Sequence, residues 1–241
     1  MSATFILSSM LATHEKDENG NRYPIVIKNT NGIVDAINKY CPNKGLFVWV
    51  CNIEDSPEEN DIRANTVFES FNMSNLAFDK YVILDGRTIK DAKELIKNAN
   101  FILLSGGKIT TQKLFLDKIN MKELLKDTNA LVVGTSAGAM NLGYNIYNFP
   151  EEPEDIDEPR IVEGLGVFDG YIIPHFEGKT MTYQLPYHTI DSVNDYILPF
   201  SYEQELLAID NDAYIIFDRK DTTYHGNCYL LKNGKATLIV K

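Results

Sequence analysis

The clearest chemical signal in this chain is a serine set among small residues, in Gly134-Thr135-Ser136-Ala137-Gly138-Ala139. The apolar run Leu131–Val133 precedes it, and the residues that follow can begin a helix. A sharp strand-to-helix turn exposes a serine hydroxyl at the carboxyl end of a sheet, and small neighbours let strand and helix approach closely. A tight turn whose serine only caps a helix is the alternative. The context favours Ser136 as a nucleophile, with the N–H of Ala137 as an oxyanion donor.

A serine nucleophile needs a base, and the chain has four histidines. His175 ends a short apolar run that begins at Tyr171, so it too is expected at the carboxyl end of a strand. His14 and His225 lie in polar, loop-like surroundings, and His188 could line a pocket. A lone histidine usually has a structural or surface role, but the strand-end position favours His175 as the base.

A second glycine turn, Ser105-Gly106-Gly107-Lys108, follows the apolar run Phe101–Leu104. Paired glycines leave backbone N–H groups unobstructed, which makes Gly107 a candidate second oxyanion donor. An ordinary strand-to-helix loop would contain the same residues, and the sequence does not separate the two interpretations.

The elements that must position these residues alternate along the first 200 residues. Short apolar runs typical of buried strands are Thr4–Ser9, Leu46–Cys51, Tyr81–Leu84, Phe101–Leu104 and Leu131–Val133. Helical patterns lie between them at Asn31–Tyr40, after the capping signal Ser56-Pro57-Glu58-Glu59, and over Lys113–Asp127 with a break near Asn120. This alternation predicts a parallel sheet covered by helices.

After about Phe200 the pattern changes to short strands separated by turns. They are Leu206–Ile209, Tyr214–Phe217, Cys228–Leu231 and Thr237–Val240. We therefore expect one α/β domain over residues 1–241. Its fold would be a doubly wound, mostly parallel sheet flanked by helices, with a small antiparallel C-terminal extension.

The composition excludes several classes of protein. Lys and Arg number 23 against 34 Asp and Glu, giving a net charge of −11, and no basic cluster indicates a nucleic-acid partner. The three cysteines form no Cys-x-x-Cys pattern, which argues against a disulfide framework or a zinc site and favours a reducing compartment. No apolar run approaches the length of a membrane span, and the N-terminus does not have a signal-peptide pattern. We expect a cytoplasmic protein without metal or cofactor, and leave a homodimer open.

Three motifs in order carry a family likeness: Leu103–Gly107, Gly134–Ala139, and Gly164-Leu165-Gly166 followed by Ile173-Pro174-His175-Phe176. They resemble peptidase family S51, which includes dipeptidase E and cyanophycinase and whose fold is related to class I glutamine amidotransferases. The likeness runs from about Thr4 to the end of the chain. It implies the same roles as the residue patterns above: Ser136 as nucleophile, His175 as base, and Gly107 and Ala137 as oxyanion donors.

The resemblance also implies a third, acidic member that fixes the imidazole tautomer. The matching position is Glu151, fifteen residues after Ser136, and Asp210 is the other candidate. The family's glycine turn usually continues with Asn, whereas this chain has Lys108. Lys108 could meet a substrate carboxylate or point to solvent. Arg160 is another candidate carboxylate partner, unless it only balances the acidic segment around it.

The leading hypothesis is a serine hydrolase that cleaves short peptides, as dipeptidase E does, through an acyl-enzyme; a preference for N-terminal aspartate is implied by the resemblance alone. The main alternative is a catalytically silent or regulatory binding protein on a glutamine amidotransferase-like scaffold, because a fold does not guarantee a function. Amidotransferase chemistry would need a cysteine at position 136. An esterase of the α/β-hydrolase type would normally separate Ser136 and His175 by more than the 39 residues found here.

Overall fold

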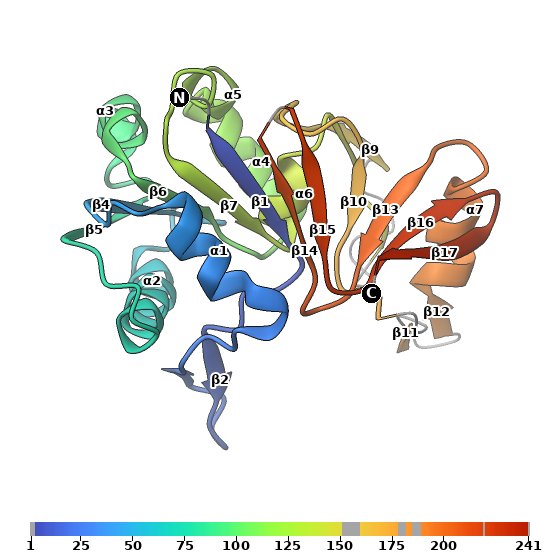
Figure 1. Ribbon diagram of the computed structural model, residues 1–241, viewed down its shortest axis with the longest axis horizontal. Helices are drawn as coiled ribbons and strands as arrows, with labels where there is room; N and C mark the ends of the chain where they lie inside the picture. Colours follow the sequence, from blue (N-terminus) through green and yellow to red (C-terminus); the bar gives the residue numbers. More distant parts are fainter. Residues whose placement is uncertain (1–2, 151–159, 178–181, 185–188, 219, 241) are drawn as a thin grey trace.

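The computed structural model describes residues 3–150, 160–177, 182–184, 189–218 and 220–240. Its centre is a seven-stranded sheet (Figure 1). In spatial order the strands are β15 (Thr222–His225), β14 (Tyr214–Phe217), β1 (Thr4–Ser8), β7 (Leu131–Thr135), β6 (Phe101–Leu104), β4 (Leu46–Val50) and β5 (Lys80–Leu84). The five strands from β1 to β5 are parallel neighbours, and β14 and β15 continue the sheet in antiparallel fashion.

The register of the parallel strands brings their carboxyl ends to one edge. Ser8 of β1 pairs with Thr135 of β7, while Leu104 of β6 pairs with Gly134 of β7 and with Val50 of β4. The loops that follow these strands therefore meet at the edge where open α/β sheets bind ligands.

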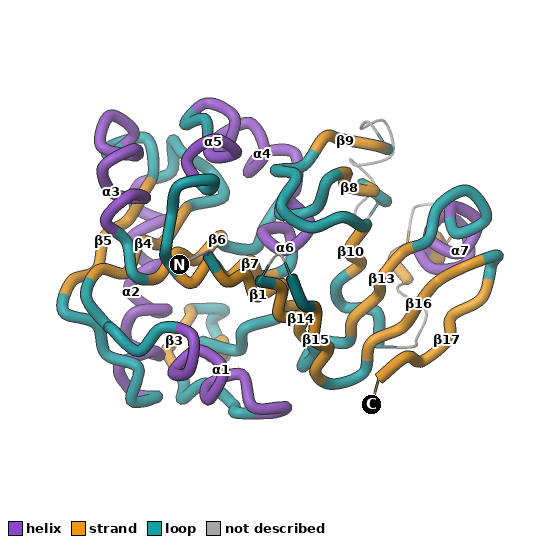
Figure 2. The backbone as a smooth tube through the Cα atoms, turned by 45° about the horizontal axis from the view of Figure 1, so that its top comes forward, coloured by secondary structure: helices purple, strands orange, loops and turns teal. Residues whose placement is uncertain are grey.

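Helices cover both faces of this sheet, as expected for a doubly wound fold. On one face lie α1 (Ile33–Tyr40) and α2 (Pro57–Met73), and on the other lie α3 (Ala92–Asn98), α4 (Ile109–Lys118), α5 (Met121–Leu124) and α6 (Ala137–Asn141) (Figure 2). Short 3₁₀ turns, η1 (Thr30–Gly32) and η2 (Ile89–Asp91), lead into α1 and α3.

Two sequence signals for helix ends can be compared with the structure. The predicted break at Asn120 is confirmed, because this residue has a left-handed backbone (φ 57°) between α4 and α5. The predicted start of α2 at Pro57 is also confirmed, but the expected side-chain cap from Ser56 is not formed. The proline ring fixes a φ that suits the first helical position, so α2 begins at Pro57 without a side-chain hydrogen bond from Ser56.

The C-terminal strands divide between two sheets. A second, four-stranded sheet has the order β10 (Tyr171–Ile173), β13 (Leu206–Ile209), β16 (Cys228–Lys232) and β17 (Lys235–Val240). The strand after β13 is β14, which returns to the large sheet. The π-helix η4 (Ser192–Ile197) and the short α7 (Leu198–Phe200) lie beside the small sheet (Figure 1).

Strand β15 was not predicted, and neither were three strand pairs outside the two larger sheets. They are β2 (His14–Lys16) with β3 (Arg22–Pro24), β8 (Asn145–Tyr147) with β9 (Ile161–Glu163), and β11 (Thr182–Gln184) with β12 (Thr189–Asp191). The β2–β3 hairpin projects from the body of the protein close to α2 (Figure 1). Its residues are mostly polar, so the alternation that marks a half-buried strand is absent.

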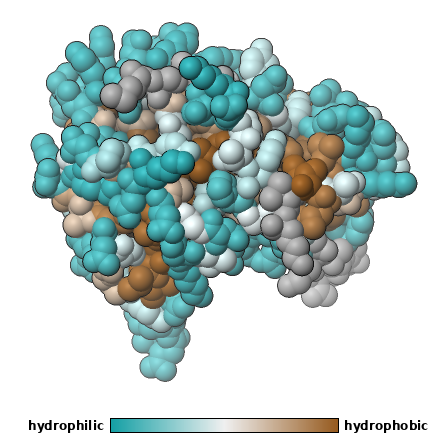
Figure 3. All heavy atoms as spheres, viewed as in Figure 1, coloured by the Kyte–Doolittle hydropathy of each residue, from teal (hydrophilic) through white to brown (hydrophobic). Residues whose placement is uncertain are grey.

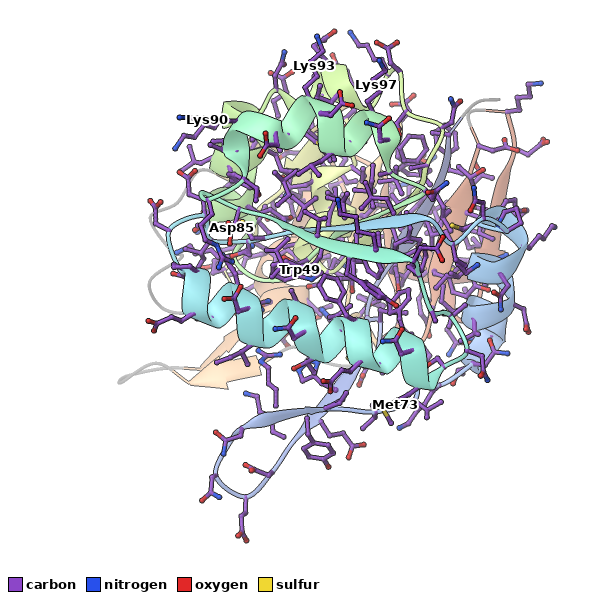
Figure 4. The ribbon with its side chains drawn as sticks, turned by 90° about the vertical axis from the view of Figure 1, so that its left-hand side faces the viewer. Trp49, Met73, Asp85, Lys90, Lys93 and Lys97 are labelled. Atoms are coloured by element: carbon purple, nitrogen blue, oxygen red, sulfur yellow. The ribbon has the colours of Figure 1, made fainter. Side chains whose placement is uncertain are left out.

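The core lies mainly between the large sheet and its helices. Phe47 of β4 packs edge-on against Phe68 and Phe71 of α2 and against Phe101 of β6, with ring centroids 4.6–5.2 Å apart. Trp49 is buried on the same side, between the sheet and α2 (Figure 4).

The outer surface is mostly hydrophilic on the face shown in Figure 3, with apolar side chains gathered in a few patches. On α3, Lys93 and Lys97 point away from the sheet (Figure 4), which leaves Ala92 and Ile96 to the core. Of the helices that the structure describes, none combines the length and the apolar character that a membrane span requires.

Candidate active site

The turn between β7 and α6 holds Ser136 in an unusual backbone conformation, with φ 52° and ψ −117°. A non-glycine residue at positive φ is strained and persists only where its surroundings enforce it. Two glycines provide that enforcement. A Cβ added at Gly134 would lie 2.5 Å from the carbonyl oxygen of Gly138, and one added at Gly138 would overlap the carbonyl oxygen of Leu104. The turn is therefore as tight as a nucleophile elbow requires.

His175 reaches this serine from the small sheet. It follows β10, and its backbone also has a positive φ, 58°. Its backbone N–H donates to Oγ of Ser9, just after β1, at 2.7 Å. Its ring nitrogen Nε2 lies 2.9 Å from Ser136 Oγ. The contact thus joins the carboxyl ends of strands from the two sheets.

The other ring nitrogen of His175 contacts an amide. Nδ1 lies 2.6 Å from Oδ1 of Asn211, and Asn211 Nδ2 donates to a carboxylate oxygen of Glu177. An ionised carboxylate only accepts hydrogen bonds, so Glu177 fixes the Asn211 amide with its oxygen toward the ring. Nδ1 must then carry the proton. This assignment leaves the lone pair of Nε2 facing the hydroxyl of Ser136.

The glycine turn after β6 lies directly against Ser136. A Cβ added at Gly106 would be 3.3 Å from Ser136 Cβ. Asn52, buried after β4, clamps the turn: its Nδ2 donates to the carbonyl oxygen of Lys108 at 2.8 Å, and its Oδ1 accepts from the N–H of Lys108 at 3.2 Å. Gly107 has φ 141°, and a Cβ there would strike the Asn52 side chain at 2.5 Å. Only glycine fits this position.

Arg63 of α2 fixes the orientation of the same turn. Its Nη2 donates to the carbonyl oxygen of Gly106 at 2.7 Å. Because a trans peptide directs its C=O and N–H to opposite sides, this bond turns the N–H of Gly107 away from Arg63. The N–H of Ala137, the first residue of α6, has no acceptor within its own helix.

The structure places the other predicted residues as follows. Glu151 lies outside the described residues. Asp210 accepts hydrogen bonds from Asn227 Nδ2 at 3.0 Å and Tyr229 OH at 3.4 Å, whereas His175 contacts the neighbouring Asn211.

Neither of the two predicted carboxylate partners is among the described residues that line the pocket beside Ser136. Lys108 is exposed at the start of α4, and Arg160 lies over the ring of Tyr196, 5.1 Å from its centroid.

A pocket of about 170 Å³ opens beside the serine. Ser136 and His175 form one part of its wall, and Trp49 and Leu103 form an apolar part. We call it the Ser136 pocket. Among the described residues that line it there is no cysteine, and Cys41, Cys51 and Cys228 are all buried. Burial raises the pKa of each of these thiols, that of Cys228 to about 11.

Sequence reasoning missed several residues around the serine. Asn52 and Asn211 were detectable in principle, because each is a polar residue that follows the end of a buried strand. Arg63 lies within a helix, and Arg22 and His14 lie in the polar hairpin, where no local pattern marks them.

Comparison with known proteins agrees with this architecture. The fold is shared with a peptidase from an acI-B1 Actinobacterium, at 17% sequence identity and a TM-score of 0.67 over 100% of this chain and 95% of that one. It is also shared with a protein assigned as a peptidase E from Listeria monocytogenes EGD-e, at 14% identity and a TM-score of 0.59 over 93% and 98% of the chains. The "Pyridoxal 5'-phosphate synthase subunit PdxT" of Methanosphaera stadtmanae is 27% identical over 171 residues, covering 67% of this chain and 82% of its own.

These likenesses define a mixed α/β fold used by peptidases, with a mostly parallel central sheet. The model of peptidase family S51 matches residues 48–223, which is most of the chain. The chain belongs to peptidase family S51 and is a serine-type peptidase.

Proposed function

We propose that this peptidase cleaves short peptides as a dipeptidase E-like exopeptidase, with Ser136 as nucleophile and His175 as base. One observation carries the proposal: His175 Nε2 lies 2.9 Å from Ser136 Oγ, although the two residues come from different sheets. A hydroxyl held by an imidazole in this way is the arrangement that activates a serine.

The proposed reaction has two stages, acylation and hydrolysis of the acyl-enzyme. Ser136 Oγ attacks the peptide carbonyl carbon while His175 Nε2 takes the hydroxyl proton. The carbonyl oxygen becomes an oxyanion, and the N–H groups of Gly107 and Ala137 stabilise it. The tetrahedral intermediate breaks its C–N bond, and His175 returns the proton to the leaving amine. Water, activated by the same imidazole, then attacks the acyl-enzyme and releases Ser136.

Asn211 takes the orienting position beside the base. Its amide oxygen accepts from Nδ1–H of His175 and so holds the tautomer that the first step needs. Glu177 supplies the negative charge behind the amide, close enough to offset the charge of the imidazolium as it forms. Glu151 stays a prediction for the third member, and the variant series in the Discussion separates it from Asn211.

The pocket supports a short substrate. A hollow of about 170 Å³ with the apolar wall formed by Trp49 and Leu103 has room for a single residue beside the reacting carbonyl.

The test compares wild type with Ser136→Ala on a panel of dipeptides, including Ala-Leu, Asp-Leu and Asp-Phe, together with their N-blocked analogues. Loss of the nucleophile should lower the rate by several orders of magnitude. Ser56→Ala is the matched control, because Ser56 makes no capping hydrogen bond at the start of α2. A fluorophosphonate should label wild type and fail to label Ser136→Ala.

Hydrolysis that survives in Ser136→Ala would refute the mechanism. A wild-type protein that neither cleaves the panel nor takes the label would favour the alternative of a silent binding protein.

A further inference from the structure

Two buried amide side chains connect the helices that follow the glycine turn and the serine turn. Gln112 lies in α4 and Asn141 ends α6, and both residues are 0% exposed. The Nδ2 group of Asn141 donates to Oε1 of Gln112 at 3.1 Å. Neither residue is among those that line the Ser136 pocket, so a role in the reaction would have to act through the turns.

Gln112 holds the first carbonyl group of the glycine turn. Its Nε2 donates to the carbonyl oxygen of Ser105 at 2.6 Å, and the next carbonyl, that of Gly106, accepts from Arg63 at 2.7 Å. Because a peptide group is planar, these two bonds fix the peptide planes on both sides of Gly106. The second of these planes carries the N–H of Gly107.

Asn141 makes the corresponding contact to the serine turn. Its Nδ2 also donates to the carbonyl oxygen of Ala137 at 3.0 Å, one turn earlier in α6. A chain of hydrogen bonds therefore runs from the carbonyl of Ser105 through the two amides to the carbonyl of Ala137. It joins the backbone just before one proposed oxyanion donor, Gly107, to the residue that supplies the other.

The Asn141 amide is retained at a cost to stability. Its Nδ2 end must face the oxygens of Gln112 and Ala137, because only the NH₂ group of an amide donates. Its Oδ1 is then buried without a hydrogen-bond partner among the described residues. An unsatisfied buried acceptor is unfavourable, and an apolar side chain of the same shape would avoid it. This cost points to a role of the pair other than stability.

We propose that Gln112 and Asn141 are positioning residues that fix the spacing between the N–H groups of Gly107 and Ala137. The inference rests on the proposed function, in which these two groups stabilise the oxyanion. Such donors are effective at about 2.7–3.1 Å from the oxygen on which charge develops. A misplacement of about 1 Å costs about a hundredfold in rate, even when its cause lies away from the reacting atoms. A bridge of two fully buried amides keeps the spacing constant.

The test replaces each amide by an apolar side chain of similar size, in Gln112→Met, Asn141→Leu and the double variant. Ser201→Ala is the matched control. Like Gln112, Ser201 is buried, donates to a backbone carbonyl at 2.6 Å (that of Leu198) and accepts one hydrogen bond, from the N–H of Gly234. Ser201 does not line the Ser136 pocket.

Arg63 is less suitable for substitution, although it also holds the glycine turn. Arg22 and Arg63 give the wall of the Ser136 pocket its positive charge, and none of the described residues in that wall is Asp or Glu. A change at Arg63 would therefore alter substrate binding and turn geometry together.

Two rates are measured for each variant, with the free energy of unfolding in urea as a third quantity. The first is steady-state hydrolysis of the best dipeptide of the panel, and the second is labelling by a fluorophosphonate, whose phosphoryl oxygen takes the place of the oxyanion. Gln112→Met should lower kcat about tenfold to a hundredfold, change KM by less than about threefold, and slow labelling by a factor similar to that for kcat. Ser201→Ala should lose comparable stability and keep both rates within about threefold of wild type.

The double variant should lose little more than the more severe single variant, because each change breaks the same bridge. Losses that multiply would overturn the bridge. Rates of Gln112→Met close to wild type, an equal loss in Ser201→Ala, or a rise in KM at constant kcat would overturn the positioning role. Should Gln112→Met not fold, Asn141→Leu is judged by the same criteria, because it leaves the bond to Ser105 in place.

The outcomes also separate this inference from the proposed function. A wild-type protein that neither hydrolyses the panel nor takes the label would refute the proposed function and the positioning role with it. Hydrolysis and labelling that occur in wild type and persist unchanged in the amide variants would refute the positioning role alone.

Discussion

Replacement of Asn211 by alanine is the sharpest test of how the base is positioned. The change removes the oxygen that lies 2.6 Å from His175 Nδ1, together with the amide N–H group that donates to Glu177. The imidazole then loses the partner that fixes its tautomer. In the transition state it also loses an acceptor for the N–H that bears part of the new positive charge.

The size of the effect follows from that bond. A hydrogen bond to a charged group contributes about 1.5–3 kcal/mol. At about 1.4 kcal/mol per factor of ten, its loss from the transition state lowers kcat/KM by roughly 10- to 150-fold. The loss should fall mainly on kcat, because Asn211 contacts the base and not the substrate pocket. The Ser136→Ala loss should be much larger.

The assay is steady-state dipeptide hydrolysis by wild type, Asn211→Ala, Glu177→Gln and Glu151→Gln, with the fold of each variant checked by circular dichroism. Glu177→Gln keeps an acceptor oxygen for the Asn211 amide, so it should lose less than Asn211→Ala. Asn211→Ala within threefold of wild type would refute the reasoning. A loss in Glu151→Gln larger than that in Asn211→Ala would assign the orienting role to Glu151 instead.

Three further predictions concern the turn, the thiols and the hairpin. Gly138→Ala should lower soluble yield and activity together, because the new methyl overlaps the carbonyl oxygen of Leu104; wild-type melting temperature and rate would contradict this. Iodoacetamide at pH 8 should leave hydrolysis unchanged, since burial holds the thiol pKa values high, that of Cys228 at about 11, and inactivation would implicate a cysteine. The pKa of His14 is lowered in the folded protein, so the unfolded chain binds more protons below pH 6.5. The free energy of unfolding therefore falls as the pH falls through this range. His14→Gln should reduce the difference between the free energies of unfolding measured with urea at pH 5.5 and pH 7.5. An unchanged difference would refute this role of His14.

Six of the seven strands of the large sheet were predicted, all but β15, because each of the six is a local signal. The runs at Phe101–Leu104, Leu206–Ile209 and Tyr214–Phe217 match the observed strands in full, and the others differ by one or two residues at their ends. Strands buried on both faces read as continuous apolar runs, so a window of five residues is enough to find them. The turn at Ser136 is equally local, since its glycines and its strand lie within a few residues of it.

The division of the C-terminal strands was not predictable in the same way. Leu206–Ile209 and Tyr214–Phe217 look alike in sequence, yet β13 joins β10 in the small sheet and β14 joins β1 in the large one. Partner choice depends on contacts between residues far apart in the chain, which no local pattern encodes. The position of Asn211 beside the base is a consequence of this choice, because the parallel pairing of β10 with β13 brings the ends of these two strands together.

Reaction and recognition have different origins in this molecule. The residues proposed to carry the chemistry, Ser136 and His175 among them, all lie within residues 48–223, where the family model matches. Arg22 and His14 lie before residue 48, on a hairpin that neither the motifs nor the apolar pattern predicts. Hydrolysis can therefore be inferred from family membership, whereas substrate choice cannot, because half of the charge in the Ser136 pocket comes from outside the matched region. A hairpin that changes only its polar residues would leave the serine and its base in place while altering the charge of the pocket wall.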